Sequence, residues 1–126
     1  MKSEIKYIEL KSRYSDDGPA WIGRVEFSKS GKSLYFNGHC LLGNGHGNCT
    51  DLETGDIYWV SGIKRNGQDR HWAGKGKIQI DRKIEKEYLL LSGIEKFDFK
   101  KYELVTISPT DKKRFTDLLN KTIENK

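Results

Sequence analysis

Short segments that alternate apolar and polar side chains, separated by turns, are the feature that most constrains the fold of this chain. Over residues 20–28, Trp21, Val25 and Phe27 alternate with polar or small neighbours. A repeat of two is typical of a β-strand with one buried face, because successive strand side chains point to opposite sides. After a glycine turn the alternation resumes over 32–38, so the sequence predicts a β-hairpin here.

Similar strand signals recur along most of the chain. Further strands are expected in four segments: 5–11, 57–65, 68–80 and 95–107. The pair Asn66-Gly67 suits a type I′ turn, because both residues tolerate a positive φ, and it predicts that 57–65 and 68–80 form a second hairpin. Residues 38–47 are rich in glycine and show no periodicity, so we expect a loop or a distorted sheet edge there.

Two helices are predicted in the second half of the chain. Asp81 is a suitable N-cap for a short helix over 82–91, which the Ser92-Gly93 pair would end. Ser108 as N-cap and Pro109 as first helical residue predict a second helix over 109–124. Its apolar stripe consists of Phe115, Leu118, Leu119, Thr122 and Ile123. That stripe should pack on the sheet, since an isolated helix of this length is marginal in water.

These elements favour a mainly β (α+β) fold. About five to six short strands with glycine bends are typical of a small SH3-like or OB-like barrel, and a curled sheet crossed by one helix is the alternative. A short internal helix and a C-terminal helix complete the expected fold. Since 126 residues is a usual length for one domain, we expect a single domain over 1–126, with a β-rich part over 4–107 and the helix over 109–124.

The sequence shows no signal for a membrane or for secretion. No apolar run approaches the roughly 18 residues that a membrane span needs. The N-terminal segment Met1–Lys6 lacks an apolar stretch of the kind found in signal peptides. Cys40 and Cys49 are therefore expected to be reduced thiols, and the expected location is the cytoplasm.

The positive charge of the chain is concentrated between residues 64 and 77. Five basic residues and one acid account there for +4 of a net charge of +5. Aromatic side chains flank the predicted turn on both sides, so the segment predicts a basic hairpin with stacking platforms. Such a surface suits RNA, DNA or an acidic protein, because the cations neutralise phosphates and the rings stack on bases. The candidate binding residues are Tyr58, Trp59, Lys64, Arg65, Gln68, Arg70, His71, Trp72, Lys75 and Lys77.

A structural interpretation of the same segment stays open. Aromatic residues are common in the cores of small barrels, and charged side chains are common in solvated turns. Whether Tyr58, Trp59 and Trp72 point inward or outward decides between the two interpretations.

A second cluster combines His39, Cys40, His46 and Cys49 in the glycine-rich segment. These are zinc-ligand types, but their spacing differs from that of zinc knuckles. His39 and Cys40 are adjacent, and adjacent strand side chains point to opposite faces, so they could hardly share one ion. We therefore expect no metal or other cofactor. A Cys/His nucleophilic pair is also weakly supported, since only Asp51 is near enough in sequence to orient it.

Two further patterns are better explained by structure than by chemistry. The run Gly43-Asn44-Gly45-His46-Gly47 has the glycine content of a phosphate-binding loop but lacks its lysine and following helix. Asp16 and Asp17 precede Gly18-Pro19 and are ordinary turn formers.

Three runs carry a resemblance to a known family: YSDDGPAWIG (14–23), ETGDIYWVSG (53–62) and NGQDRHW (66–72). Over about residues 5–90 the chain resembles small uncharacterised bacterial proteins, some of which carry the label 1-deoxy-D-xylulose-5-phosphate synthase. That enzyme is a large thiamine-diphosphate protein, and 126 residues cannot house its cofactor domains. The resemblance therefore implies a bacterial source, and it implies no catalytic residue.

The sequence leads to three classes of function. The leading hypothesis is a non-enzymatic module that binds nucleic acid through the basic hairpin. The alternative is a protein-interaction or immunity-type partner whose surface aromatics form an interface, and the third class is a small metal-dependent enzyme.

Overall fold

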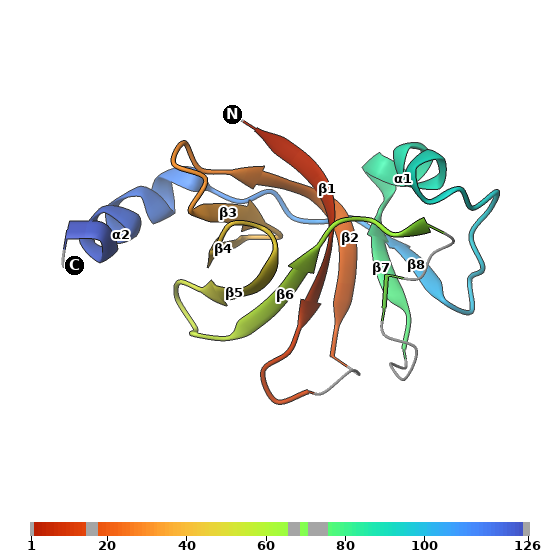
Figure 1. The fold of residues 1–126 in the computed structure, drawn as a ribbon, viewed down its shortest axis with the longest axis horizontal. Helices are drawn as coiled ribbons and strands as arrows, with labels where there is room; N and C mark the ends of the chain where they lie inside the picture. Colours follow the sequence, from red (N-terminus) through yellow and green to blue (C-terminus); the bar gives the residue numbers. More distant parts are fainter. Residues whose placement is uncertain (1, 15–17, 66–68, 71–75, 125–126) are drawn as a thin grey trace.

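The computed structural model describes residues 2–14, 18–65, 69–70 and 76–124. Within these ranges the chain forms a closed antiparallel β-barrel with two added strands, a short helix and a C-terminal helix (Figure 1). The predicted mainly β barrel is thereby confirmed.

The barrel is built from the first six strands in simple succession. Their bounds are β1 Ser3–Leu10, β2 Ala20–Phe27, β3 Ser33–Phe36, β4 His39–Leu42, β5 Gly47–Asp51 and β6 Ile57–Ser61. Each strand pairs antiparallel with the next. The barrel closes because β1 also pairs with β6, with Tyr7 opposite Ser61 and Leu10 opposite Tyr58.

The first predicted hairpin is confirmed, and the loop or distorted sheet edge predicted over 38–47 is partly wrong. Glu26 and Phe27 of β2 pair with Tyr35 and Leu34 of β3, as the alternation indicates. Residues 39–42, however, form strand β4, which pairs with β3 along its whole length. A four-residue strand between glycines is too short to show a period of two, so its sequence does not reveal it. The hydrogen bonds that form the strand come from β3 and β5.

The other elements lie outside the barrel against β2. They are β7 Ile78–Asp81, the 3-10 helix η2 Arg82–Ile84, helix α1 Glu85–Ser92 and β8 Tyr102–Val105. β7 pairs in parallel with the first residues of β2, and β8 pairs in parallel with β7. The predicted short helix is confirmed, with Asp81 as its cap: Lys83 N donates to Asp81 Oδ1 at 3.0 Å.

The second predicted hairpin is wrong in the part that the structure describes. β6 ends at Ser61 and has β1 and β5 as its partners, whereas β7 pairs with β2 and β8. The proposed turn at 66–67 lies outside the described residues. Of the strand predicted over 95–107, residues 102–105 form β8, and the rest of the segment is not a strand.

Two hydrophobic cores lie on opposite sides of the β1–β2 pair. The barrel interior contains Ile8, Val25, Phe27, Leu34, Phe36, Leu41, Cys49, Tyr58 and Val60. The outer core, under α1 and β7, contains Tyr7, Ala20, Ile22, Ile78, Ile80, Ile84, Tyr88, Phe97 and Tyr102. Successive residues of β1 and β2 thus serve different cores, as the alternation of strand side chains requires.

Helix α2 (Lys112–Glu124) packs on the barrel through Phe115 and Leu119. Phe115 is fully buried against Tyr35 and Cys40 on the outer face of β3 and β4. The helix begins three residues later than predicted. Asp111 caps it, with Lys113 N donating to Asp111 Oδ1 at 3.1 Å.

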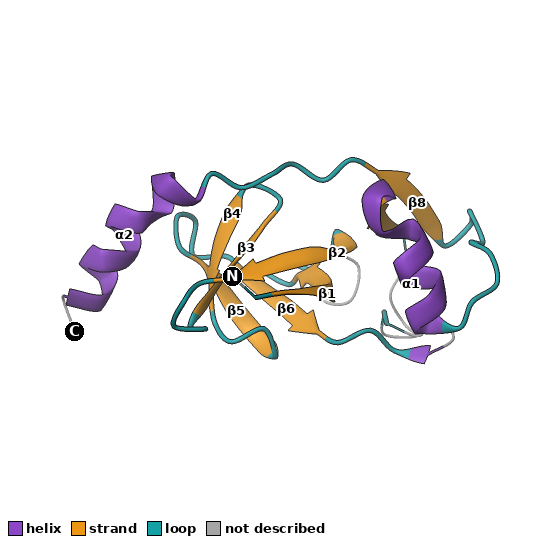
Figure 2. Ribbon diagram, turned by 90° about the horizontal axis from the view of Figure 1, so that it is seen from above, coloured by secondary structure: helices purple, strands orange, loops and turns teal. Residues whose placement is uncertain are grey.

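Residues 108–110 are hydrogen-bonded to the turn between β3 and β4. Ser108 N donates to Asn37 Oδ1 at 3.1 Å, and Gly38 N donates to Thr110 Oγ1 at 2.8 Å. These bonds tie the segment to the barrel, which explains why the helix does not begin at Pro109. Figure 2 shows α2 at the end of the molecule opposite α1. None of the helices that the structure describes is long and apolar enough to cross a bilayer.

Candidate functional site

The aromatic side chains of β6 divide between the barrel interior and its surface. Tyr58 is 6% exposed and belongs to the interior core, whereas Trp59 is 41% exposed on the outer face. The Trp59 indole extends toward β5, where a Cβ added at Gly47 would lie 3.9 Å from Trp59 Cζ3. Of the three aromatics that the sequence singled out, Tyr58 is therefore core, Trp59 is available as a platform, and Trp72 lies outside the described residues.

The strands beside β6 supply polar neighbours for Trp59. Its cross-strand partners are Glu9 on β1 and Asn48 on β5. Glu9 is buried, accepts a hydrogen bond from Tyr7 Oη and lies 2.7 Å from Lys11 Nζ. Because these partners compensate the carboxylate, it adds little repulsion toward an anion above Trp59. We call this outer face of β1, β6 and β5 the Trp59 face.

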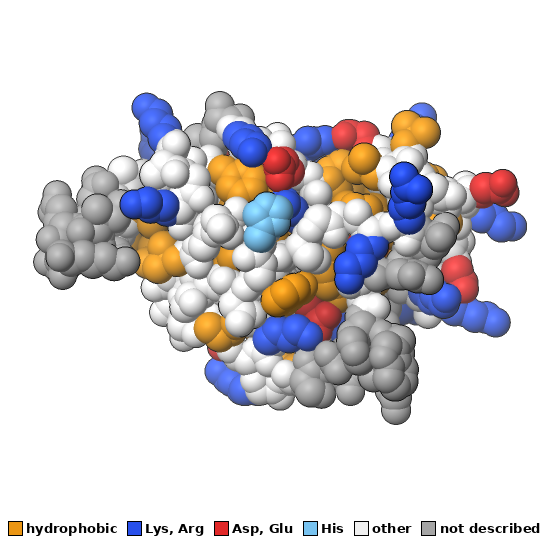
Figure 3. All heavy atoms as spheres, in the orientation of Figure 1, with side chains coloured by type: hydrophobic (Ala, Val, Ile, Leu, Met, Phe, Trp, Pro, Cys, Tyr) orange, Lys and Arg blue, Asp and Glu red, His pale blue; other side chains and the backbone are white. Residues whose placement is uncertain are grey.

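The basic residues of the 64–77 segment have different roles in the structure. Lys64 and Arg65 are exposed just beyond the end of β6, and Lys77 is exposed just before β7. Arg70 is half-buried, and its Nη2 donates to Gly18 O at 2.6 Å, so it braces the chain that enters β2. Gln68, His71 and Lys75 lie outside the described residues. In Figure 3 the Lys and Arg side chains are spread over the visible face and do not gather on one element.

A buried acid fixes the segment that carries Lys64 and Arg65. Asp69 Oδ1 accepts from Lys64 N at 2.7 Å, and Oδ2 accepts from Tyr88 Oη of α1 at 2.9 Å. Burial raises the pKa of Asp69, although these hydrogen bonds oppose the rise. Asp69 therefore anchors the chain after β6 to α1 and sets the place of the two cations.

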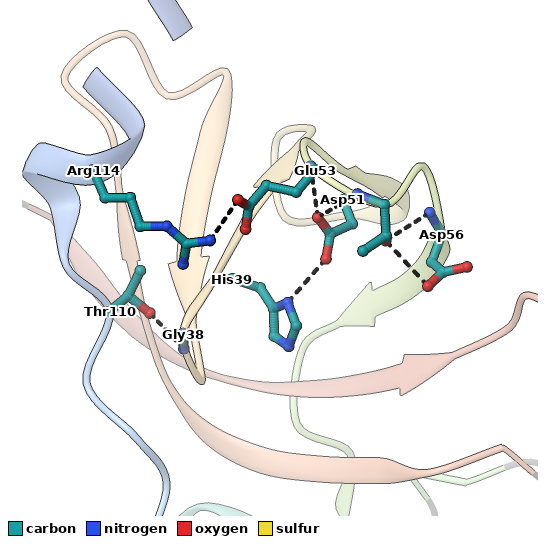
Figure 4. Close-up of polar contacts among 8 residues, drawn as sticks. Gly38, His39, Asp51, Glu53, Asp56, Thr110 and Arg114 are labelled. Atoms are coloured by element: carbon teal, nitrogen blue, oxygen red, sulfur yellow. Dashed lines mark hydrogen bonds and ion pairs between the residues drawn. The ribbon is translucent and has the colours of Figure 1, made fainter. Parts of the chain in front are cut away.

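A second polar arrangement joins β4 to the turn after β5 (Figure 4). His39 Nδ1 lies 2.9 Å from Asp51 Oδ2, and Asp51 Oδ1 accepts from Glu53 N at 2.8 Å and Thr54 N at 3.2 Å. The His39 ring packs 5.9 Å from the Tyr58 ring. A buried carboxylate can orient a histidine for proton transfer. Here the contacts assign the pair a structural role, because they fix the turn that connects β5 to β6.

The two cysteines face different cores. Cys49 lies in the barrel interior, while Cys40 lies outside it with Tyr35 and Phe115. Burial raises the pKa of both thiols, that of Cys40 to about 11, so neither is activated as a nucleophile. Within the described ranges no three His, Cys, Asp or Glu side chains are grouped as metal ligands would be.

Sequence reasoning missed Glu9, Lys11 and Asn48 as neighbours of Trp59. The alternation over 5–11 does place Glu9 and Lys11 on the face opposite Ile8 and Leu10. No local signal shows that β1 pairs with β6, since about 50 residues separate them in the chain.

The fold and this face define a small β-barrel protein with an aromatic side chain exposed among polar and basic neighbours. No protein-family model, no curated protein and no solved structure matches the chain. The function must therefore be argued from the residues alone.

Proposed function

We propose that this protein is a non-enzymatic binding module that binds single-stranded RNA or DNA through the Trp59 face. The observation that carries the proposal is the 41% exposure of a tryptophan on a barrel strand. An exposed aromatic ring offers a face on which a base can stack, and such stacking contributes about 1–3 kcal/mol.

The charges around Trp59 support an anionic strand as the partner. Lys11 follows β1, the antiparallel partner of β6, and is paired with Glu9, whereas Lys64 and Arg65 are exposed just beyond the end of β6, the strand that carries Trp59. A backbone that passes over Trp59 can place phosphates near them and release counterions. The outer faces of small barrels offer such strands as flat platforms for bases.

Fluorescence anisotropy with labelled single-stranded oligonucleotides of about 12 nucleotides tests the proposal. Binding should weaken between about 50 mM and 200 mM salt, and Trp59→Ala should lower the affinity about 5- to 100-fold. The double variant Lys64→Ala/Arg65→Ala should lower the salt dependence. Phe99→Ala is the matched control, because it removes an exposed aromatic ring that lies outside the Trp59 face.

Absence of salt-sensitive binding would refute the proposal, as would equal binding by the wild type, Trp59→Ala and the double variant. Circular dichroism of each variant shows that a loss of binding is not a loss of fold.

A protein partner is the second candidate, and a different surface favours it. Leu90 is 85% exposed on α1, and Leu91 and Phe99 are also exposed. Exposed apolar side chains of this size are typical of interaction surfaces when they adjoin one another. Light scattering with Leu90→Ser as variant separates the candidates: a change of mass would support association through α1, and Trp59→Ala would leave that mass unchanged.

A further inference from the structure

An open pocket lies at one end of the barrel, and we call it the end pocket. It has a volume of about 380 Å³ and lies between the β2–β3 turn and the β4–β5 loop. The side chains that matter for its chemistry are Lys2, Ser28, Lys29, Ser30, Asn44 and His46. All of them lie within the described residues.

Positive charge predominates in the end pocket. Lys2 and Lys29 bring two ammonium groups, and His46 brings an imidazole that donates at least one N–H in either protonation state. Glu4 is the acid in the lining, and its carboxylate lies 3.2 Å from Lys2 Nζ and 3.3 Å from Lys6 Nζ. Because Lys6 helps to compensate Glu4, the pocket keeps a positive excess that an anion would offset.

The two serines provide a hydroxyl donor beside these cations. Ser28 Oγ accepts from Ser33 N at 3.3 Å, and Ser30 Oγ accepts from Lys32 N at 3.3 Å. The two hydroxyl oxygens lie 3.3 Å apart, so a bond between them uses one hydroxyl hydrogen. The second hydrogen can point outward and donate to a ligand oxygen.

The two loops are held together before any ligand arrives. Gly43 N of the β4–β5 loop donates to Lys32 O of the β2–β3 turn at 2.9 Å, and His46 N donates to Asn44 Oδ1 at 3.0 Å. Phe27 forms the floor: Lys2 Nζ lies 5.7 Å from the centre of its ring. A Cβ added at Gly45 would lie 2.8 Å from the same ring, so glycine allows the loop to close over it. A preformed site loses little entropy on binding.

We propose that the end pocket binds a phosphate monoester group. Such a group carries between one and two negative charges at neutral pH and offers three acceptor oxygens, which match two ammonium groups, an imidazole N–H and a serine hydroxyl. A phosphodiester has fewer charges and fewer open oxygens and suits the pocket less. The phosphate would come from a small free phosphate compound or from the end of a nucleic-acid strand.

The end pocket is close in sequence and sheet to the Trp59 face. His46 precedes β5 directly, and Asn48 of β5 pairs with Trp59. A strand whose base stacks on Trp59 could thus present its terminal phosphate to His46. The phosphate proposal does not depend on this strand, and its test separates the two proposals.

The first measurement is a titration of the ¹⁵N-labelled protein with inorganic phosphate, followed by NMR at constant ionic strength. We expect saturable shifts of the amides of 28–33 and 44–47, and about tenfold weaker binding by Lys29→Gln and by His46→Gln. Lys86→Gln is the matched control, because it removes an exposed lysine of α1 far from the pocket in sequence. Shifts that do not saturate, or equal affinities for all variants, would overturn the proposal.

The second measurement identifies the source of the phosphate. If it is a strand end, a 5′- or 3′-phosphorylated oligonucleotide binds the wild type more tightly than its hydroxyl form, and Lys29→Gln removes the difference. If phosphorylation has no effect while inorganic phosphate still saturates the pocket, the source is a small phosphate compound. Trp59→Ala should keep its response to inorganic phosphate even if it no longer binds oligonucleotides, so failure of one proposal is distinguishable from failure of the other.

Discussion

Tyr58 and Trp59 are successive residues of β6, yet the structure places them on opposite sides of the barrel wall. Tyr58 packs at 6.4 Å from the Trp21 ring and 5.9 Å from the His39 ring, inside the barrel. Trp59 lies outside, opposite Glu9 and Asn48. Tyr58 is thus a core residue and Trp59 a surface residue, so the two side chains should respond differently to mutation.

Tyr58→Ala should cost much more stability than Trp59→Ala. Removing a buried aromatic ring leaves a cavity and typically costs about 3–5 kcal/mol, whereas truncating a surface side chain costs about 1 kcal/mol or less. Urea denaturation followed by circular dichroism measures both values. Equal losses of unfolding free energy would show that Trp59 is as much a part of the core as Tyr58. Trp59 would then not be available as a surface for stacking.

The sequence predicts the elements that local patterns determine. The β2–β3 hairpin follows from alternation on both sides of a short turn, and the α1 region follows from the Asp81 cap and from Gly93, whose φ is 77°. The outward position of Trp59 also follows from alternation once Tyr58 and Val60 are known to be interior.

Pairings between distant segments explain the errors. The first residues of β2 pair with β7, about 58 residues further along the chain, and turn chemistry near residue 66 contains no information about that contact. The end pocket was missed because the β2–β3 turn and the β4–β5 loop are brought side by side by the β3–β4 pairing, and strand β4 was not predicted. The glycines of that loop resemble a phosphate-binding motif weakly, and Lys2 and Lys29 lie outside the motif.

Asp51, the buried last residue of β5, should be important for stability. Asp51→Ala removes the acceptor of Glu53 N and Thr54 N and the partner of His39, and should cost about 2–3 kcal/mol. Asp51→Asn keeps an oxygen for the two N–H groups and should cost less. Chemical denaturation checks the order of the two variants, and a larger loss for Asn than for Ala would contradict the proposed role of Oδ1 in the turn.

Gly23 should be intolerant of even one methyl group. A Cβ there would lie 2.8 Å from Ile107 Cδ1 and 2.9 Å from Phe36 Cε1, so Gly23→Ala must displace a core ring and should cost about 1–3 kcal/mol. Gly62→Ala is the matched control, because a Cβ at Gly62 meets nothing within 4 Å. It should leave stability unchanged or raise it by up to about 1 kcal/mol. Thermal or urea unfolding measures the unfolding free energies of the two variants. Equal values would show that the barrel interior has room for a methyl group beside Phe36.

Asp69 should make the protein less stable as the pH rises through the mildly acidic range. Burial raises its pKa in the folded state above the ordinary value of 3.8, so the folded state holds this proton more tightly than the unfolded state. The stability that Asp69 contributes is therefore full below the ordinary value, and it is lost as the pH rises through the raised pKa. Asp69→Asn keeps an oxygen for Lys64 N and does not titrate.

The difference in unfolding free energy, wild type minus Asp69→Asn, should thus fall with pH across this window and then level off. Tyr88→Phe provides a second check, because the Tyr88 hydroxyl donates to Asp69 Oδ2 and favours the ionised carboxylate. Without that donor the pKa of Asp69 should rise further, and the fall in stability should extend to higher pH. Urea denaturation at a series of pH values measures all three proteins. A difference that increases with pH would mean that hydrogen bonds outweigh burial at Asp69 and that its pKa is lowered by folding.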